Sequence, residues 1–132
     1  MEGTDGSQAD ATTLGGRLTR RIIGCAYRVA NVLGAGFLEK VYENALAHEL
    51  RKAGLRVAQQ TPCEVRYDGI VVGSYVADMV VEDRVVVELK AAAQLNPVHE
   101  AQLLNYLRAS GRRLGLLLNF GTPRVGVRRF AL

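Results

Sequence analysis

The sequence lacks the residues and runs that would place it in several large classes of protein. Its two cysteines, Cys25 and Cys63, lie far apart and form no Cys-x-x-Cys pair, so we expect reduced thiols and not a disulfide framework. The two histidines, His48 and His99, lack the spacing of a zinc pair. No apolar run approaches the roughly 20 residues of a membrane helix, and no basic start followed by an apolar run indicates a secretory signal. We therefore expect a cytoplasmic protein without a membrane partner.

What is present fits one globular domain with a positive charge. The chain has 132 residues, 48% hydrophobic and 23% charged, which is enough to bury one sizeable core. The net charge is +4. A nucleic acid is one candidate partner, since phosphate contacts dominate nucleic-acid affinity, and a merely solvated basic surface is the other interpretation. Much of the excess lies late in the chain, at Arg108, Arg112, Arg113, Arg124, Arg128 and Arg129.

The periodicity of apolar residues predicts the order of helices and strands. Residues 1–16 are rich in Gly, Ser, Thr, Asp and Ala, so we expect a disordered leader before a single domain over 17–132. Asp68-Gly69 separates two β-rich runs and indicates a two-residue hairpin. This order predicts an α+β fold, with helices packed on a mixed sheet. The expected elements are helices over 18–33 and 38–53, strands over 57–67, 70–81 and 84–89, a helix over 96–110, and strands over 114–120 and 125–130.

Three ionisable residues stand out among the apolar residues of the second and third strands: Asp78, Glu88 and Lys90. Ionisable groups in such surroundings are costly unless they are paired or bind a metal. Two neighbouring carboxylates also repel each other unless a cation lies between them. Carboxylate oxygens suit Mg²⁺ or Mn²⁺. A surface ion pair on an edge strand is the alternative interpretation.

Strand geometry turns this grouping into a prediction about the hairpin. Glu88 and Lys90 are two residues apart and share a face of the sheet. Opposed residues in an antiparallel pair have a constant sum of residue numbers, and for Asp78 to stand opposite Glu88 that sum must be even. The connecting loop must then contain an odd number of residues, for instance Glu82-Asp83-Arg84 between a Val81–Val85 pair. A two-residue turn would place Asp78 on the other face.

Such a site would suit phosphodiester hydrolysis. A metal held by carboxylates polarises the phosphoryl oxygen and lowers the pKa of a bound water. A cation such as Lys90 can orient that water or neutralise the developing charge.

The flanking helices add further candidates. Glu39 and Tyr42 share a helix face after Gly36, although Glu39 could simply be an acid favoured by the helix dipole. His99, Gln102 and Tyr106 fall on one stripe of the later helix and could bind a phosphate or hold the loop after Lys90, or be a polar margin of its packing face.

These residues resemble a known family. Gly36-Phe37-Leu38-Glu39-Lys40-Val41-Tyr42 matches the motif of the GxxExxY protein family, which is grouped with the PD-(D/E)xK nuclease superfamily. The resemblance implies a restriction-endonuclease-like α-β-β-β-α-β core. It departs at Ala77, where the superfamily has proline. The similarity covers the chain from about Leu18 and continues through Asp78, Glu88-Leu89-Lys90, His99-Glu100-Ala101-Gln102, Asn105-Tyr106-Leu107 and Leu117-Leu118-Asn119-Phe120-Gly121.

The resemblance also implies roles for individual residues. Asp78 and Glu88 resemble the metal-binding acids, Lys90 the catalytic lysine, and Glu39 the acid of the preceding helix. Gln102 and Tyr106 resemble the QxxxY motif of RecB-like nucleases.

The leading hypothesis is a Mg²⁺- or Mn²⁺-dependent nuclease with little sequence specificity. Asp78, Glu88 and the backbone carbonyl of Leu89 would bind the metal, with Glu39 as a further ligand. The substrate backbone would contact Gln102, Tyr106, His99 and Tyr42. A non-catalytic nucleic-acid-binding or assembly module is the alternative, and a hydrolase of another phosphoester is a third reading. A homodimer or larger complex is expected because so small a domain has little surface for a duplex.

Overall fold

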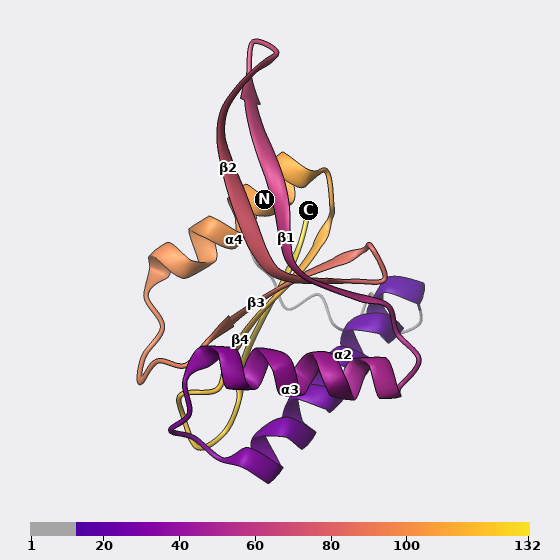
Figure 1. Ribbon diagram of the computed structural model, residues 1–132, viewed down its shortest axis with the longest axis vertical. Coiled ribbons are helices and arrows are strands. Elements are labelled where there is room, and N and C mark those ends of the chain that lie inside the picture. Colours follow the sequence, from indigo (N-terminus) through magenta and orange to yellow (C-terminus); the bar gives the residue numbers. More distant parts are fainter. Residues whose placement is uncertain (1–12) are drawn as a thin grey trace.

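The computed structural model describes residues 13–132, and in this range three helices pack on a five-stranded mixed sheet (Figure 1). The strands lie in the order β1-β2-β3-β4-β5, with β3 and β4 parallel and the other neighbours antiparallel. The expected α+β, restriction-endonuclease-like architecture is confirmed. The elements are α2 (Leu14–Leu33), α3 (Glu39–Lys52), β1 (Val57–Tyr67), β2 (Ile70–Val81), β3 (Val85–Lys90), α4 (Pro97–Ser110), β4 (Leu114–Asn119) and β5 (Gly126–Ala131).

The first helix begins earlier than the apolar pattern predicts. The side chain of Thr13 accepts a hydrogen bond from the backbone N–H of Gly16 at 2.9 Å and so caps the first turn. Residues 14–16, expected in the leader, are therefore helical, and that boundary was wrong. The rest of the expected leader, residues 1–12, lies outside the described residues.

The two faces of the sheet are covered by different helices. α2 and α3 pack on one face, where Ile22 and Leu46 meet Val87 of β3. α4 packs on the other face, where Leu103 meets Val86. Alternate side chains of β3 thus enter two separate cores, as the pleat requires. Within residues 13–132, no helix combines the length and apolar character that crossing a bilayer requires.

The β1–β2 hairpin extends beyond the body of the molecule as a two-stranded arm (Figure 1). Asp68 and Gly69 form its tip with φ of 54° and 76°, as a two-residue turn with two left-handed residues requires. The hairpin predicted from this dipeptide is confirmed. Tyr67 and Ile70 flank the tip and are largely exposed.

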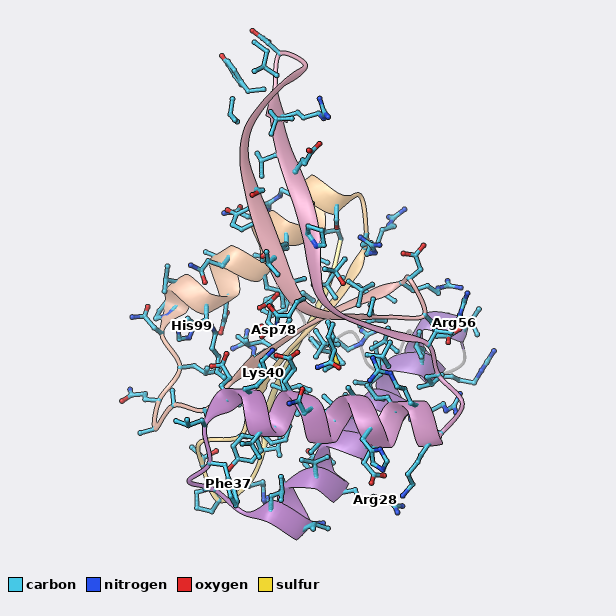
Figure 2. All side chains as sticks on the ribbon, viewed as in Figure 1. Arg28, Phe37, Lys40, Arg56, Asp78 and His99 are labelled. Carbon is cyan, nitrogen blue, oxygen red and sulfur yellow. The ribbon has the colours of Figure 1, made fainter. Side chains whose placement is uncertain are left out.

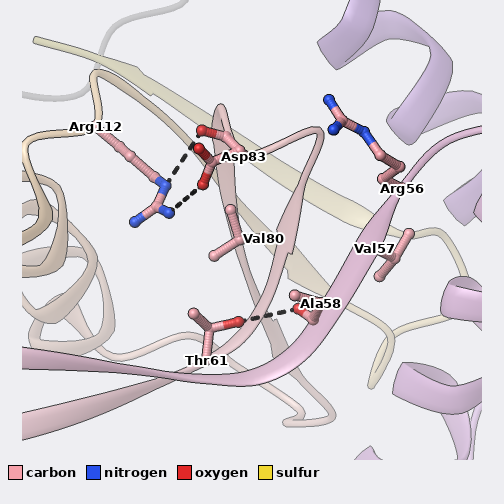
Figure 3. Close-up of a pocket in the computed structure, with 7 residues that line it drawn as sticks. All are labelled: Arg56, Val57, Ala58, Thr61, Val80, Asp83 and Arg112. Carbon is pink, nitrogen blue, oxygen red and sulfur yellow. Dashed lines mark hydrogen bonds and ion pairs between the residues drawn. The ribbon is translucent and has the colours of Figure 1, made fainter.

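The β2–β3 hairpin has the predicted three-residue loop. Val81 pairs with Val85, and Glu82 and Asp83 between them both have positive φ. The guanidinium of Arg112 binds the side chain and backbone carbonyl of Asp83 and fixes this loop (Figure 3). The cavity beside it has a volume of about 230 Å³ and contains none of the three ionisable residues singled out above.

The loop after β3 is fixed to the end of β4. The Asn119 side chain accepts a hydrogen bond from the N–H of Ala92 at 3.0 Å and donates one to its carbonyl oxygen at 2.9 Å. Gly121 lies against the same backbone, and a Cβ added there would stand 2.3 Å from the Ala92 nitrogen and oxygen. These contacts hold the chain immediately after Lys90 in place.

This close approach predicts opposite effects for two glycine substitutions. Gly121→Ala should destabilise the protein by about 1–3 kcal/mol or more, because the methyl group overlaps backbone atoms that cannot rotate away. Gly24→Ala is the matched control, since it lies in α2 with nothing within 4 Å of an added Cβ. It should stabilise the protein by about 0.5–1 kcal/mol. Urea denaturation measures both changes, and a shift of the same sign for both would contradict this account of Gly121.

Candidate functional site

The candidate site lies where β2 and β3 separate. Their pairing runs from Val81–Val85 to Met79–Val87, so Asp78 and Glu88 are the first residues beyond the last pair. The backbone N–H of Leu89 donates to Asp78 Oδ2 at 2.8 Å, and the N–H of Asp78 donates to Glu88 Oε2 at 3.3 Å. The two carboxylates thus take the place of strand-to-strand hydrogen bonds. The odd loop has aligned them as the sequence predicted.

The two acids are strongly coupled. Burial raises the pKa of Glu88, and the charge of Asp78 and a side-chain hydrogen bond between the two carboxyl groups raise it further, to about 8. The positive charge of Lys90 opposes this shift. Carboxyl groups that share a hydrogen bond cannot both ionise easily near neutral pH unless a cation joins them. A positive ion bound between Asp78 and Glu88 would therefore allow both carboxyl groups to ionise.

Lys90 lies at the end of β3, two residues beyond Glu88 and on the same face of the strand. Its carbonyl oxygen accepts a hydrogen bond from Phe120 N–H at 2.8 Å, which anchors the strand end to the chain after β4. Its ammonium lowers the pKa of three groups that come from three elements: Glu39 of α3, Glu88 of β3 and His99 of α4. The ammonium is therefore within electrostatic reach of all three groups.

Glu39 is the first residue of α3, and its side chain is largely exposed. Burial around its carboxyl group raises its pKa, Lys90 lowers it and Asp78 raises it. Gly36 precedes it with φ of 113°, a conformation that favours glycine. The loop thus delivers Glu39 to the edge of the site, within electrostatic reach of the acids.

Tyr42 has a structural role in place of the expected contact with substrate. It is 1% exposed, and its hydroxyl donates to the Gly34 carbonyl at 2.5 Å and accepts from Phe37 N–H at 3.2 Å. Its ring stacks on Phe120 with centroids 4.8 Å apart. The tyrosine therefore holds the loop before α3, whose Phe37 is labelled in Figure 2, and has no surface left for a substrate.

The three expected residues of α4 divide into two groups. His99 lies at the start of the helix (Figure 2), where its Nδ1 accepts from the Asn96 N–H at 3.4 Å and completes a capping box. Gln102 is exposed, and Tyr106 is 6% exposed with its ring packed on Tyr75. Burial and the charges of Glu88 and Asp78 raise the pKa of Tyr106 well above its usual value. Tyr106 thus adjoins the acids, whereas His99 is explained by the helix cap.

Most of the late arginines bind other parts of this chain. Four of the six have partners: Arg112 binds Asp83, Arg113 the Leu132 carbonyl, Arg128 Glu100, and Arg129 Thr19. Within residues 13–132, the side chains of Arg108 and Arg124 form no hydrogen bond or ion pair. Four of the six late arginines are therefore already engaged within the chain.

Comparison with known proteins identifies the family of this chain. A family model described as the PD-(D/E)XK nuclease superfamily matches residues 16–130. The chain belongs to the PD-(D/E)XK nuclease superfamily. No curated protein matches the chain. The narrower resemblance to the GxxExxY family stays a prediction.

Two solved structures share the superfamily fold with this chain. The crystal structure of SSO0001 matches with a TM-score of 0.55 and 18% identity, over 70% of this chain and 50% of that one. An alkaline exonuclease from Laribacter hongkongensis, LHK-Exo, matches with a TM-score of 0.52 and 14% identity, over 96% of this chain and 75% of that one. The chain thus spans about half the length of SSO0001. At these identities the likeness shows the fold alone.

Divalent metals are general in this superfamily, and the donors present here fit one. Within residues 13–132, no three His, Cys, Asp or Glu side chains converge as ligands, so Asp78 and Glu88 form a pair without Glu39 as a third direct ligand. Mg²⁺ commonly uses one or two protein carboxylates and keeps several waters. The Leu89 carbonyl points toward the same side as its N–H, which faces Asp78, because an extended residue directs both groups to one side.

Sequence reasoning missed two residues that support the site. Asn119 is 4% exposed at the end of an apolar strand and, with Gly121, holds the loop after Lys90. A polar residue that ends a fully buried strand was the available indication. Glu43 is a buried acid one helical turn after Glu39, and nothing local distinguishes it from a surface charge.

The raised pKa of Glu88 predicts a dependence of stability on pH in metal-free buffer. Between its ordinary value of 4.5 and about 8, the folded protein binds the Glu88 proton more tightly than the unfolded chain does. The free energy of unfolding of the wild type must therefore fall as pH rises through this window. Glu88→Gln carries no such proton, so by pH 9 the variant should gain about 2 kcal/mol or more relative to the wild type, compared with pH 5.

Denaturant unfolding in EDTA at pH 5, 7 and 9 measures this difference. Glu64→Gln is the control, because it removes an exposed carboxylate from the β1–β2 arm. Wild-type and Glu88→Gln curves that stay parallel across this range would refute the raised pKa of Glu88.

Proposed function

We propose that this protein is a metal-dependent nuclease that hydrolyses phosphodiester bonds of nucleic acid. The observation that carries the proposal is the coupled Asp78–Glu88 pair at the open end of β2 and β3, with Lys90 on the same face. Two adjacent acids repel each other when both are ionised, and a cation bound between them would relieve this repulsion. Membership of the superfamily supports the same chemistry.

The metal would be Mg²⁺ or Mn²⁺, held by Asp78, Glu88 and the carbonyl oxygen of Leu89. When bound, it would polarise the phosphoryl oxygen and lower the pKa of a bound water. Asp78 is already oriented by the Leu89 N–H, so little rearrangement is needed on binding.

The other side chains would act on the water and the phosphate. The Lys90 ammonium would hold the attacking water and offset the negative charge that develops on the phosphate. Glu39, at the edge of the site, would accept a hydrogen bond from that water. Gln102 and Tyr106 would donate to the phosphate backbone, since within residues 13–132 neither side chain has a hydrogen-bond partner.

We expect little sequence specificity, because backbone contacts carry no base information and residues 13–132 contain no element for reading bases. Mixed single- and double-stranded DNA and RNA are therefore the appropriate first substrates. A homodimer stays a prediction from the small size of the domain, and light scattering coupled to gel filtration would test it.

Cleavage should require both the metal and the three ionisable residues. We expect activity with Mg²⁺ or Mn²⁺ that EDTA abolishes, and a loss of at least about 100-fold in Asp78→Asn, Glu88→Gln and Lys90→Ala, because each removes a group that acts on the reacting atoms. The matched controls are Glu64→Gln on the β1–β2 arm and Lys52→Ala on α3, which should retain activity. Cleavage that persists in EDTA and in all three variants would eliminate the proposal.

A non-catalytic nucleic-acid-binding module is the second candidate. One observation favours it: within the described residues only two side-chain ligands converge, so metal binding is weaker than in a closed site. This candidate predicts nucleic-acid binding that is equal in EDTA and in Mg²⁺, unchanged in Lys90→Ala, and without cleavage in the assay above.

Tyr106 provides a test of substrate contact that is separate from metal binding. Tyr106→Phe should keep the ring stack on Tyr75, whose centroid lies 4.3 Å away, and should lose only the hydroxyl. A hydrogen bond to a charged group contributes about 1.5–3 kcal/mol, so binding of nucleic acid should weaken about 10-fold or more. The control is Tyr75→Phe, and affinity would be measured in Ca²⁺ to prevent turnover. Equal affinities for the two variants would remove Tyr106 from the substrate contacts.

A further inference from the structure

β1 and β2 keep one register from Val57 to Val65, with a single pair missing beside the candidate site, and the register shifts only farther out on the arm, between Val65 and Arg66. The register includes Gln59–Met79 and Thr61–Ala77 but skips the pair between them, Gln60 and Asp78. Gln60 has φ of 52°, a left-handed conformation that is uncommon for a residue with a side chain. Irregularities of this kind often lie next to active sites, where they re-aim a side chain.

The irregularity rotates β2 at Asp78. Residues two apart on a regular strand share a face. Met79 nevertheless belongs to the core under α2 and α3, as does Val81, whereas Ala77 belongs to the core under α4. The strand therefore changes faces at Asp78. Asp78 is paired with neither β1 nor β3 in the sheet. Its N–H donates to Glu88 and its carboxylate accepts from the Leu89 N–H instead.

A buried acid on α3 binds the side chain of Gln60. Glu43 of α3 is 3% exposed, and its Oε1 accepts from Gln60 Nε2 at 2.9 Å and from Lys40 Nζ at 3.0 Å. Its Oε2 accepts from Gln59 Nε2 at 2.7 Å. A buried carboxylate is tolerated because these donors satisfy it. Figure 2 shows Lys40 on α3 below Asp78. The network therefore links α3 to the irregular point of β1.

We propose that Glu43 is a positioning residue for Asp78. By binding Gln59 and Gln60 it holds Gln60 in the left-handed conformation, and this conformation keeps Asp78 out of the β1–β2 ladder with its carboxylate toward Glu88. Only one consequence of this inference, that metal binding depends on Glu43, rests on the proposed function. The positioning itself can be measured without a metal.

Two readouts follow from the loss of Glu43. In Glu43→Ala, Mn²⁺ measured by calorimetric titration should bind about 10- to 100-fold more weakly, the range typical for partners that orient a metal ligand. In metal-free buffer, the amide of Leu89 should exchange with solvent faster relative to that of Val87, because its hydrogen bond to Asp78 loosens. Glu43→Gln keeps the volume and one acceptor, so it provides the same comparison if Glu43→Ala does not fold.

The decisive variant is the double substitution Glu43→Ala with Gln60→Gly. Glycine adopts positive φ without support, so the double variant should regain most of the Mn²⁺ affinity and of the Leu89 protection. A purely structural role for Glu43 would not be rescued by removing a second side chain. Glu49→Ala is the matched control, because Glu49 lies on the same helix and also pairs with a lysine three residues away, Lys52 at 3.5 Å.

The outcomes separate this inference from the proposed function. The inference is overturned if Glu43→Ala changes the Leu89 exchange no more than Glu49→Ala does, or if the double variant is as impaired as the single one. Either result leaves the nuclease proposal standing. Absence of Mn²⁺ binding in the wild type would instead count against the proposed function, and the Leu89 amide would still decide whether Glu43 positions Asp78.

Discussion

The site depends on the hydrogen bond from the Leu89 N–H to the Asp78 carboxylate, 2.8 Å long. It forms because β2 and β3 stop pairing just before Asp78, so a backbone donor on β3 needs a new acceptor. Asp78 is the acceptor, and its carboxylate is thereby brought against Glu88. The need of the Leu89 N–H for an acceptor thus brings Asp78 against Glu88, and two adjacent carboxylates favour a bound cation.

The rest of the fold holds β2 and β3 in place on both sides of the point where they separate. On the paired side, Met79, Val81, Val85 and Val87 are fully buried under α2 and α3, which holds the hairpin closed there. Beyond the separation, Asn119 and Gly121 hold the chain after Lys90. Tyr42 fixes the loop that presents Glu39. Elements held by these contacts therefore flank the acids, as a preorganised site requires.

The sequence predicted those features that depend on local pattern. Alternation and turn residues located the strands, and the parity argument for Asp78 and Glu88 required the odd loop that the structure contains. It could not distinguish a polar side chain that serves a substrate from one that serves the backbone, and it therefore did not anticipate the backbone hydrogen bonds of His99 and Tyr42. It also could not connect Glu43 with Gln60, because their contact spans 17 residues and two elements.

The sequence also could not show which of its positive charges are available to bind a substrate. A positive net charge favours a polyanion, but four of the six late arginines bind this chain's own carbonyl, carboxylate or hydroxyl groups. Two of these four, Arg112 and Arg128, are already in ion pairs, so binding a phosphate would break one ion pair to form another and would gain little affinity. Under the proposed function, the local contacts to the scissile phosphate would therefore come chiefly from Lys90, the bound metal and the unpaired donors of α4. Substrate affinity and metal affinity should consequently be linked, since the phosphate completes the coordination that two carboxylates leave open.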